Sequence, residues 1–379
     1  MRTRSPELDR TGLTHRLGAV FALWLIALAA VAADARAQAM DITVTPKQPL
    51  IENTKAGQSL SFDFILQNPS ARKVELTNLR LAVFDSSGHL ILQRFAGSGL
   101  NAVFPGNPAI DANGKLLILN PFHAFSSGLE LARLTYDFVF REDAKDAREF
   151  SVQVTVEPRP FRPRTALIIP LRGRALLYEG HDFYAHHRRV DLTSPVVAQL
   201  GVTTNPTRYA YDFCVVDDKG ALFRNRGEND EDWLGFGAPV VAPGDGVVKE
   251  TRNGVEDNVL GKKMFDFRLV FQDIKAFYGN YVILDHQNGE YSLLLHLKKG
   301  SVRVKPGDRV RQGQELAQMG ISGDSEFVHV HYQLQNATEI NNETLPSSFG
   351  PLRLWRGKTF RLVDSGQIDS GEIVENSPK

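Results

Sequence analysis

The sequence predicts a mainly β protein with two domains, and three observations support this expectation. The chain has 379 residues, more than a single hydrophobic core usually serves. Runs of alternating apolar and polar residues recur along it, separated by clusters of Gly, Pro, Asn, Asp and Ser. No long amphipathic helical pattern interrupts these runs. We therefore expect antiparallel sheets in both domains.

The first segment, residues 1–37, has the pattern of a secretory signal peptide. Several arginines precede an apolar run over 17–33, and Ala35-Arg36-Ala37 provides small residues at the cleavage position. The apolar run is short for a membrane span. We expect export to the periplasm or the medium, with no transmembrane anchor left after cleavage.

Residues 38–158 predict an antiparallel, immunoglobulin-like β-sandwich. Strict alternation predicts strands over 41–45, 59–66, 74–84 and 150–156, with turn residues between strands. This region contains no recognisable catalytic constellation. We expect it to position the second domain, to cover the groove of that domain or to bind a protein partner, and the fold by itself does not choose among these roles.

A proline-rich, extended joint with a histidine-rich loop follows over 159–200. The second β domain is expected over 201–348, where glycine-containing turns at 237–248 and 305–316 predict hairpins. Residues 349–379 form a C-terminal extension, and its polar end, from about residue 365, is expected to be loose.

Composition excludes several classes of protein. Lys and Arg number 44, equal to Asp and Glu, so no basic excess indicates a nucleic-acid partner. The single cysteine, Cys214, cannot form an internal disulfide. Its apolar neighbours Phe213 and Val215 predict a small buried residue rather than a metal ligand.

The most informative short motif is His329-Val330-His331, which lies in a predicted strand. Side chains two apart in a strand project from the same face. One imidazole can then bind a metal while the other transfers a proton. By itself such a pair is more often two polar residues on a solvated strand face, so its meaning depends on the surrounding segments.

Five segments in order, spanning residues from about 205 to 340, resemble the lysostaphin-type, LytM-like zinc metalloendopeptidases. The matching segments are 209–212, 237–248, 279–286, 291–297 and 320–331. The resemblance implies a lysostaphin-like antiparallel β-sheet peptidase domain of the duplicated-hybrid-motif fold. It also implies one Zn²⁺ per chain and hydrolysis of peptide cross-links in bacterial peptidoglycan.

Residue roles follow from the same resemblance. The family holds zinc with a His and an Asp four residues apart and with the second His of the His-x-His pair. This implies Asp212 and His331 as metal ligands and His296 and His329 as catalytic histidines. The chemistry is consistent, because a three-ligand zinc with an open position activates water and free imidazoles can carry its proton.

One departure from the family pattern puts the metal in question. Arg208 stands four residues before Asp212, and a guanidinium cannot bind a cation. Either another histidine supplies the third ligand or the site no longer holds catalytic zinc. For the first case we take His187 as the substitute, with His186 and His181 as alternatives.

The second case describes a non-catalytic module that binds the cell wall or regulates another wall hydrolase. In the catalytic case, Arg208 near the site is expected to bind a substrate carboxylate with its two-pronged guanidinium. Asp285-His286 is not expected to be a catalytic pair, because adjacent strand residues point to opposite faces.

Overall fold

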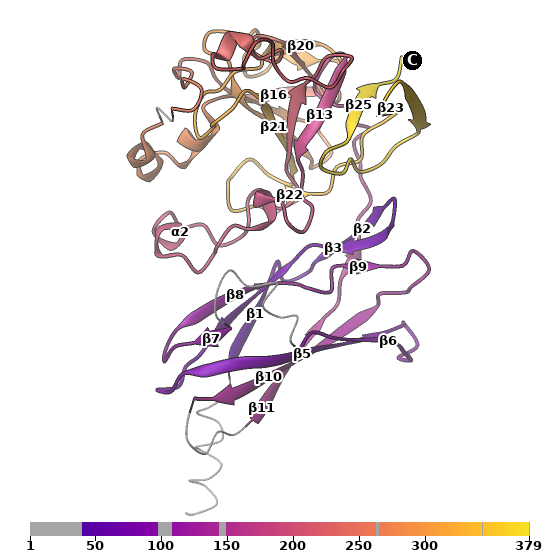
Figure 1. The fold of residues 1–379 in the computed structure, drawn as a ribbon, viewed down its shortest axis with the longest axis vertical. Helices are drawn as coiled ribbons and strands as arrows, with labels where there is room; N and C mark the ends of the chain where they lie inside the picture. The colour runs from indigo at the N-terminus through magenta and orange to yellow at the C-terminus, as the bar shows by residue number, and fades with distance from the viewer. Residues whose placement is uncertain (1–39, 98–107, 144–148, 263–264, 343, 379) are drawn as a thin grey trace, which may run out of the picture.

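The computed structural model describes residues 40–97, 108–143, 149–262, 265–342 and 344–378 (Figure 1). The predicted signal peptide lies outside these residues. Within them no helix is both long and apolar enough to cross a membrane. The helices of this part are short 3-10 turns and the five-residue α2 (Pro195–Gln199). The expectation of a mainly β protein built from antiparallel sheets is confirmed.

The N-terminal domain is a β-sandwich around one apolar core. One sheet has the order β11-β10-β5-β6, with β7 pairing β5, and it faces the sheets β1-β4-β8 and β12-β2-β3-β9. Aromatic rings of Phe64, Tyr136 and Phe138 meet edge to face between the layers, with centroids 4.8 and 4.9 Å apart. Each fully buried ring contributes about 2 to 3 kcal/mol. The strands are β1 (Asp41–Thr45), β2 (Leu50–Thr54), β3 (Gly57–Leu60), β4 (Asp63–Gln67), β5 (Val74–Phe84), β6 (Leu90–Phe95), β7 (Ala109–Ile110), β8 (Lys115–Leu119), β9 (Ala124–Phe125), β10 (Arg133–Glu142), β11 (Glu149–Val156) and β12 (Arg159–Pro160).

The predicted strand over 59–66 is two strands in the structure. Strand β3 pairs with β2 and β9, whereas β4 pairs with β1 and β8. The chain therefore changes sheets at Ser61 and Phe62, and Phe62 fills the core at the crossing. Alternation continues through the crossing, which is why the pattern alone showed one strand. The change of sheet places Asp63 at the start of β4.

The second domain is built on an antiparallel sheet with the strand order β19-β16-β17-β18-β21-β14-β13-β25-β23-β24. Strand β22 pairs with β21, and a separate ribbon joins β15 to β20. Its core is distinct from that of the sandwich. The strands are β13 (Arg174–Glu179), β14 (Tyr211–Val215), β15 (Pro239–Val241), β16 (Gly246–Arg252), β17 (Asn280–Asp285), β18 (Tyr291–Leu297), β19 (Arg309–Val310), β20 (Glu315–Gln318), β21 (Val330–Gln335), β22 (Thr344–Leu345), β23 (Leu352–Arg356), β24 (Thr359–Val363) and β25 (Ile373–Asn376).

The main sheet of this domain includes strands from the segments on both sides of residues 201–348. Strand β13 comes from the lead-in, yet it pairs with β14 inside the main sheet. The C-terminal segment is not a loose tail, because β25 pairs with both β13 and β23. Buried Leu352, Leu354 and Val374 add to the same core. The C-terminal segment is polar and has few apolar residues, so alternation did not indicate a strand there. Strand β13, which pairs with β25, lies far away in sequence.

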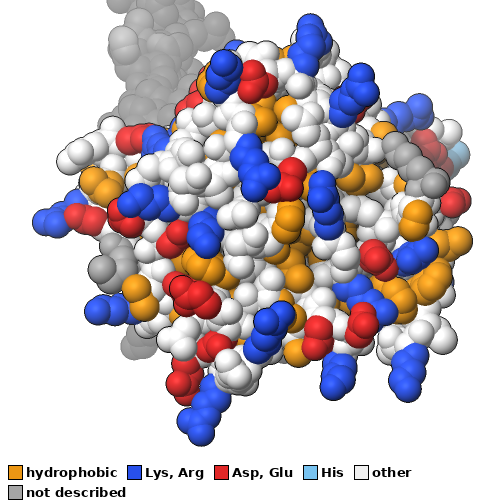
Figure 2. All heavy atoms as spheres, turned by 90° about the horizontal axis from the view of Figure 1, so that it is seen from above, with side chains coloured by type: hydrophobic (Ala, Val, Ile, Leu, Met, Phe, Trp, Pro, Cys, Tyr) orange, Lys and Arg blue, Asp and Glu red, His pale blue; other side chains and the backbone are white. Residues whose placement is uncertain are grey.

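The two domains meet along the β2–β3 hairpin, which reaches from the sandwich to the second domain (Figure 1). Leu50 of β2 packs into the core of the second domain. The proline-rich joint adds β12, which pairs in parallel with β2. The joint is thus bound to the sandwich before the chain enters the second domain. Seen from the end of the second domain, Lys and Arg side chains are interspersed with Asp and Glu (Figure 2).

Candidate metal centre

Two of the predicted metal ligands lie side by side because of the register of adjacent strands. Strands β14 and β21 are antiparallel, with Asp212 directly opposite His331. Strand β18 continues the row, with Leu295 opposite His331. Directly opposed residues share one face of a sheet. The Asp212 Oδ1 atom lies 3.0 Å from Nδ1 of His331.

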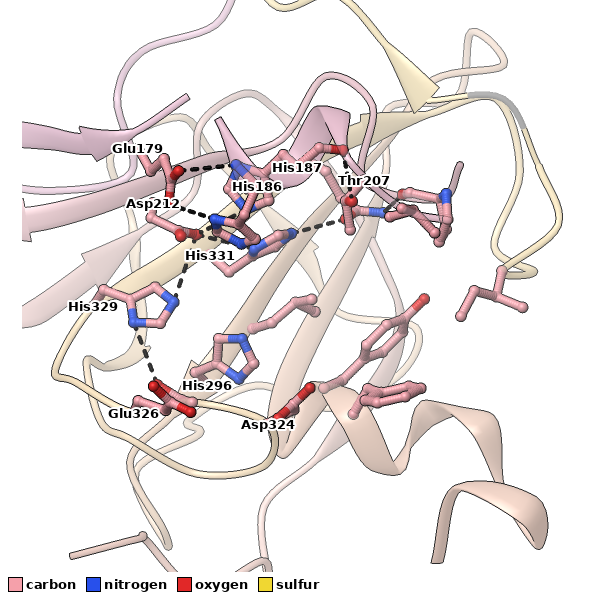
Figure 3. Close-up of a pocket in the computed structure, with 18 of the residues that line it drawn as sticks. Glu179, His186, His187, Thr207, Asp212, His296, Asp324, Glu326, His329 and His331 are labelled. Carbon is pink, nitrogen blue, oxygen red and sulfur yellow. Dashed lines mark hydrogen bonds and ion pairs between the residues drawn. The ribbon is translucent and has the colours of Figure 1, made fainter. Parts of the chain in front are cut away.

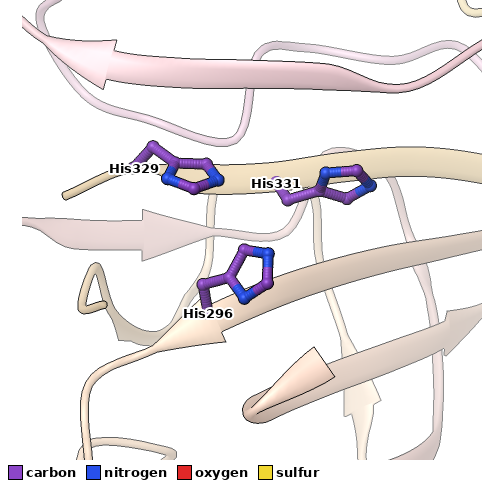
Figure 4. A group of neighbouring side chains, drawn as sticks. All are labelled: His296, His329 and His331. Carbon is purple, nitrogen blue, oxygen red and sulfur yellow. The ribbon is translucent and has the colours of Figure 1, made fainter. Parts of the chain in front are cut away.

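His296 reaches the same face through a distortion of β18. The register between β17 and β18 shifts across Asn280 and Val282, so β18 carries an extra residue there. His296 has φ of 62°, in the left-handed region that a residue with a Cβ rarely adopts. Strand alternation would turn it away from Leu295, but the bulge turns it back. Its ring lies 5.0 Å from that of His329 and 5.8 Å from that of His331, measured between centroids (Figure 4).

His187 arrives from outside the sheet, on the single-turn 3-10 helix η2 (His186–Arg188). Its backbone carbonyl accepts a hydrogen bond from the Asn205 side chain at 2.8 Å and another from Thr207 at 3.2 Å. Its side chain is 1% exposed, and Nε2 lies 3.4 Å from Asp212 Oδ1 (Figure 3). The structure thus brings His187, Asp212 and His331 together.

Hydrogen bonds on the outer side of His187 and His331 fix where their protons lie. Nδ1 of His187 contacts the Gly180 carbonyl at 2.8 Å, and a carbonyl can only accept, so Nδ1 carries the proton. The Gln333 amide donates to the Pro206 carbonyl at 3.0 Å, which turns its Oε1 toward Nε2 of His331 at 2.8 Å. Nε2 of His331 is therefore protonated.

Three lone pairs consequently face one another with no proton assigned among them. They belong to Nε2 of His187, Oδ1 of Asp212 and Nδ1 of His331. Nε2 of His187 is buried and has no hydrogen-bond partner among the described residues. Donors about 2.0 to 2.1 Å from a tetrahedral zinc lie about 3.3 Å from each other, close to the 3.0 and 3.4 Å found here. The residues present fit a zinc ion.

The electrostatics of the cluster favour the protonation states that metal binding needs. Burial by itself raises the pKa of the Asp212 carboxyl, but His187 and His329 beside it hold that pKa well below its ordinary value. Burial lowers the pKa of His187, although Asp212 opposes this change. An ionised carboxylate and a neutral imidazole are the ligand forms that bind zinc.

His296 and His329 form a second pair beside the three donors. Nδ1 of His296 donates to the Ser322 carbonyl at 2.9 Å, and Nδ1 of His329 donates to the Phe327 carbonyl at 2.9 Å. Their Nε2 atoms therefore carry the lone pairs. Burial lowers the pKa of both imidazoles, and for His296 the neighbouring His329 adds to the effect. Each ring is thus neutral, and its Nε2 lone pair carries no proton.

All five residues open onto one cavity of about 530 Å³. Apolar side chains of Val197, Leu200 and Val202 line it together with Phe277 and Tyr278. Glu179, Asp324 and Glu326 also line the cavity (Figure 3).

The two alternatives to His187 lie in different surroundings. His181 is buried but bonds Glu52 of the sandwich, with Nε2 and Oε2 3.0 Å apart. His186 lies beside His187 and Asp212, yet its ring contacts Glu179 and its side chain is 61% exposed. His186 is thus at the rim of the cluster, and His181 is outside it.

Arg208 does not occupy the place expected of a substrate-binding residue. It is 1% exposed, and its guanidinium donates to Asp63 of the sandwich at 2.7 Å. It does not line the cavity described above. A substrate therefore cannot reach Arg208 in this structure, and the expected contact with a substrate carboxylate is wrong. The position four residues before Asp212 faces the other domain here.

Two other expectations agree with the structure. Cys214 is buried, 1% exposed, and burial raises the pKa of its thiol. His286 bonds the Asp245 carbonyl and the Ser292 hydroxyl, both at 2.7 Å, away from the cluster.

Gln333 is a residue of the cluster that the sequence reasoning missed, and it bonds His331. It follows His329 and His331 at the same two-residue spacing, so strand alternation could have placed it on their face. The Gly180 carbonyl carried no such signal, because only the fold brings it to His187.

Comparison with known proteins identifies the class of this domain. Residues 233–343 match the model of Peptidase family M23. The chain therefore contains a family M23 domain, and the resemblance to lysostaphin-type peptidases is confirmed. The match includes His296, His329 and His331 but begins after Asp212 and His187.

Two curated relatives come from Vibrio cholerae. Peptidoglycan DD-endopeptidase ShyA is 34% identical over 99 residues, which is 26% of this chain and 18% of ShyA. Peptidoglycan DD-endopeptidase ShyC is 32% identical over 110 residues, 29% of this chain and 20% of ShyC. The chain thus spans about a fifth of the length of these relatives.

Solved structures that are similar to this chain include catalytic domains of peptidases. The catalytic domain of lysostaphin from Staphylococcus simulans is 22% identical, covering 36% of this chain and 74% of that domain, with a TM-score of 0.22. The catalytic domain of the M23 protein EnpA from Enterococcus faecalis, as an A109H mutant, is 18% identical, covering 36% and 73%, with a TM-score of 0.23.

Proposed function

We propose that this chain is an exported zinc metalloendopeptidase that hydrolyses peptide cross-links of bacterial peptidoglycan. His187, Asp212 and His331 would hold one zinc ion, and His296 and His329 would act as catalytic histidines. The observation that carries the proposal is that the lone-pair nitrogens of His187 and His331 lie 3.4 and 3.0 Å from the same buried Asp212 oxygen, close to the spacing of donors around a tetrahedral zinc. The M23 match and the two cell-wall relatives support the substrate class. The signal-like N-terminus supports export.

Zinc in this site would activate a water molecule and polarise the peptide carbonyl. The protein's own residues then handle the protons. Nε2 of His296 and Nε2 of His329 face the cavity unprotonated, so either can accept the proton that water gives up. The imidazolium that results is a donor, and it can return the proton to the amine that leaves.

The positions of the two catalytic histidines are set by main-chain carbonyls. Ser322 and Phe327 accept their Nδ1 protons and so keep each ring in one tautomer and one orientation. The His187 and His331 rings are held in the same manner by the Gly180 carbonyl and the Gln333 amide oxygen. Apolar side chains line the cavity together with these histidines.

The test is metal content and cleavage by the purified protein. Wild type is expected to carry one zinc per chain and to cut cross-linked muropeptides. His331→Ala is expected to lose both properties, because it removes a ligand from the sheet. Zinc-free wild type, or equal cleavage by wild type and His331→Ala, would contradict the proposal and favour a non-catalytic module that binds the wall or regulates another hydrolase.

A further inference from the structure

One carboxylate of the sandwich lies between two arginines of the second domain. Asp63 Oδ1 accepts from Nη1 of Arg188 at 3.1 Å, and Oδ2 accepts from Nη1 of Arg208 at 2.7 Å. All three side chains are at most 2% exposed. The ion pairs of the described residues give neither arginine a second carboxylate. Asp63 is thus the counter-charge for two buried guanidinium groups.

Both arginines connect directly to the backbone that carries His187. Arg188 follows His187 in the single turn η2. Arg208 ends the loop from which Asn205 and Thr207 bond the His187 carbonyl, at 2.8 and 3.2 Å. Any movement that separates the two guanidinium groups would therefore move η2 relative to β14, and with it Nε2 of His187 relative to Asp212.

A second contact between the domains holds the other end of the same segment. Glu52 on β2 bonds His181, and both side chains are buried. The next residue toward β13, Gly180, provides the carbonyl that accepts the Nδ1 proton of His187. The segment from Gly180 to Arg188 is therefore tied to the sandwich at both ends.

Of the two contacts between the domains, the one at Asp63 contains more buried charge than the one at Glu52. One carboxylate facing two guanidinium groups leaves one positive charge in excess in a buried place. Arg188 Nη2 and Arg208 Nε and Nη2 have no hydrogen-bond partner in the described part of the chain. Loss of the carboxylate would leave two buried like charges without compensation, which is strongly unfavourable. The guanidinium groups are expected to move apart.

We propose that Asp63 of the N-terminal sandwich is a positioning residue for the metal centre, acting through Arg188 and Arg208 on the ligand His187. The inference rests on the proposed zinc site and adds a role for the sandwich domain: the metal centre is complete only when the two domains are docked. Arg208 stands where the family has its first histidine, and His187 takes the place of that ligand. The pair of Arg208 with Asp63 would help to hold the turn η2, which carries His187.

The experiment measures zinc affinity of the full-length mature chain by competition with a chromogenic chelator. Asp63→Asn keeps the size of the side chain and removes its charge. We expect its zinc affinity to fall by about 10- to 100-fold, the usual effect of losing a group that orients a ligand. Visible spectra of the Co²⁺-loaded protein are expected to change in band intensity, because one ligand moves.

Lys55→Ala is the matched control. Lys55, in the turn between β2 and β3, forms ion pairs between the domains with Asp369 and Glu372. Its loss removes a contact between the domains but leaves the Asp63–Arg188 and Asp63–Arg208 pairs in place, so zinc affinity is expected to stay at the wild-type value. Thermal unfolding of both variants shows whether each remains folded.

The outcomes separate this inference from the proposed function. A wild-type protein that binds no zinc would contradict the proposed function. Wild type with zinc, together with a folded Asp63→Asn of unchanged affinity, overturns the role of Asp63 alone. Should Asp63→Asn fail to fold, Arg188→Lys replaces it: the charge stays, the two-pronged geometry is lost, and the same fall in affinity is expected. Unchanged affinity in folded Arg188→Lys then overturns the inference.

Discussion

The candidate metal centre has a half built on strands and a half built on a turn. Asp212 and His331 are directly opposed on β14 and β21, so the hydrogen-bonded ladder itself sets their separation. His187 sits on the turn η2, whose place depends on side-chain hydrogen bonds and ion pairs with distant residues. The positions of Asp212 and His331 are therefore set by strand pairing and can be predicted from the local pattern. The position of His187 depends on contacts with the rest of the fold.

The comparison also suggests how a ligand can change its place in the chain. Arg208 stands where the family resemblance expects the first histidine, yet the site still presents three lone pairs. A coordination position is defined by geometry, so a residue from another segment can fill it. The strand half stays in place while the turn half is supplied by the lead-in.

The largest expected effect tests whether the turn half is a ligand at all. His187→Ala should abolish stoichiometric zinc and reduce cleavage to background, as loss of a strand ligand does, because three donors are the minimum here. Its neighbour His186 is the matched control: its ring faces Glu179 and solvent. Zinc content by atomic absorption and muropeptide cleavage check both variants. A His186→Ala protein that loses zinc while His187→Ala keeps it would reverse the assignment.

A second large effect separates binding from catalysis. His296→Ala and His329→Ala leave the three donors in place, so zinc content should remain at one per chain. Cleavage should fall by about 10²- to 10⁴-fold, the range expected when a proton-transferring group is removed. Rate measurements on the zinc-loaded variants test this. Zinc loss in either variant would place that histidine among the ligands instead.

A smaller effect is expected from the residue that orients the strand ligand. Gln333→Leu keeps His331 but removes the acceptor of its Nε2 proton. Zinc affinity should fall by about 10- to 100-fold, with the fold retained. Chelator competition measures this directly. Affinity equal to that of wild type would mean that the β-ladder alone orients His331.

The smallest effect concerns the strain stored at His296. This residue adopts φ of 62° within β18, a conformation that costs about 1 kcal/mol for a residue with a Cβ and little for glycine. His296→Gly and His296→Ala should show the same loss of cleavage, but the glycine variant should be more stable by about 1 kcal/mol. Denaturant unfolding of the pair measures the difference. A more stable alanine variant would show that the bulge is not strained.

Much of the strand half could be predicted from sequence because its information is local. Alternation placed His329 and His331 on one face, and the same rule extends to Gln333. The run over 74–84 coincides with β5, since a long strand with regular burial leaves a clear pattern. The bulge at His296 left no such mark, because it depends on the register between β17 and β18.

The turn half shows what the sequence alone could not determine. The sequence limited the proposed third ligand to a few histidines in the lead-in and gave only a preference for His187. The tertiary structure places the three histidines differently: Glu52 bonds His181 outside the cluster, Glu179 holds His186 at the rim, and Gly180 turns His187 inward.

By itself, then, the sequence determined the β architecture, the family and the strand-borne residues, all of which depend on periodicity and motif order. Only the tertiary structure decided the position of His187 beside Asp212, the burial of Arg208 and the inclusion of the C-terminal strands in the sheet. The burial of Arg208 and the added strands depend on contacts between residues more than a hundred positions apart, such as Asp63 with Arg208. Side-chain pairing at that range has no periodic signature along the chain.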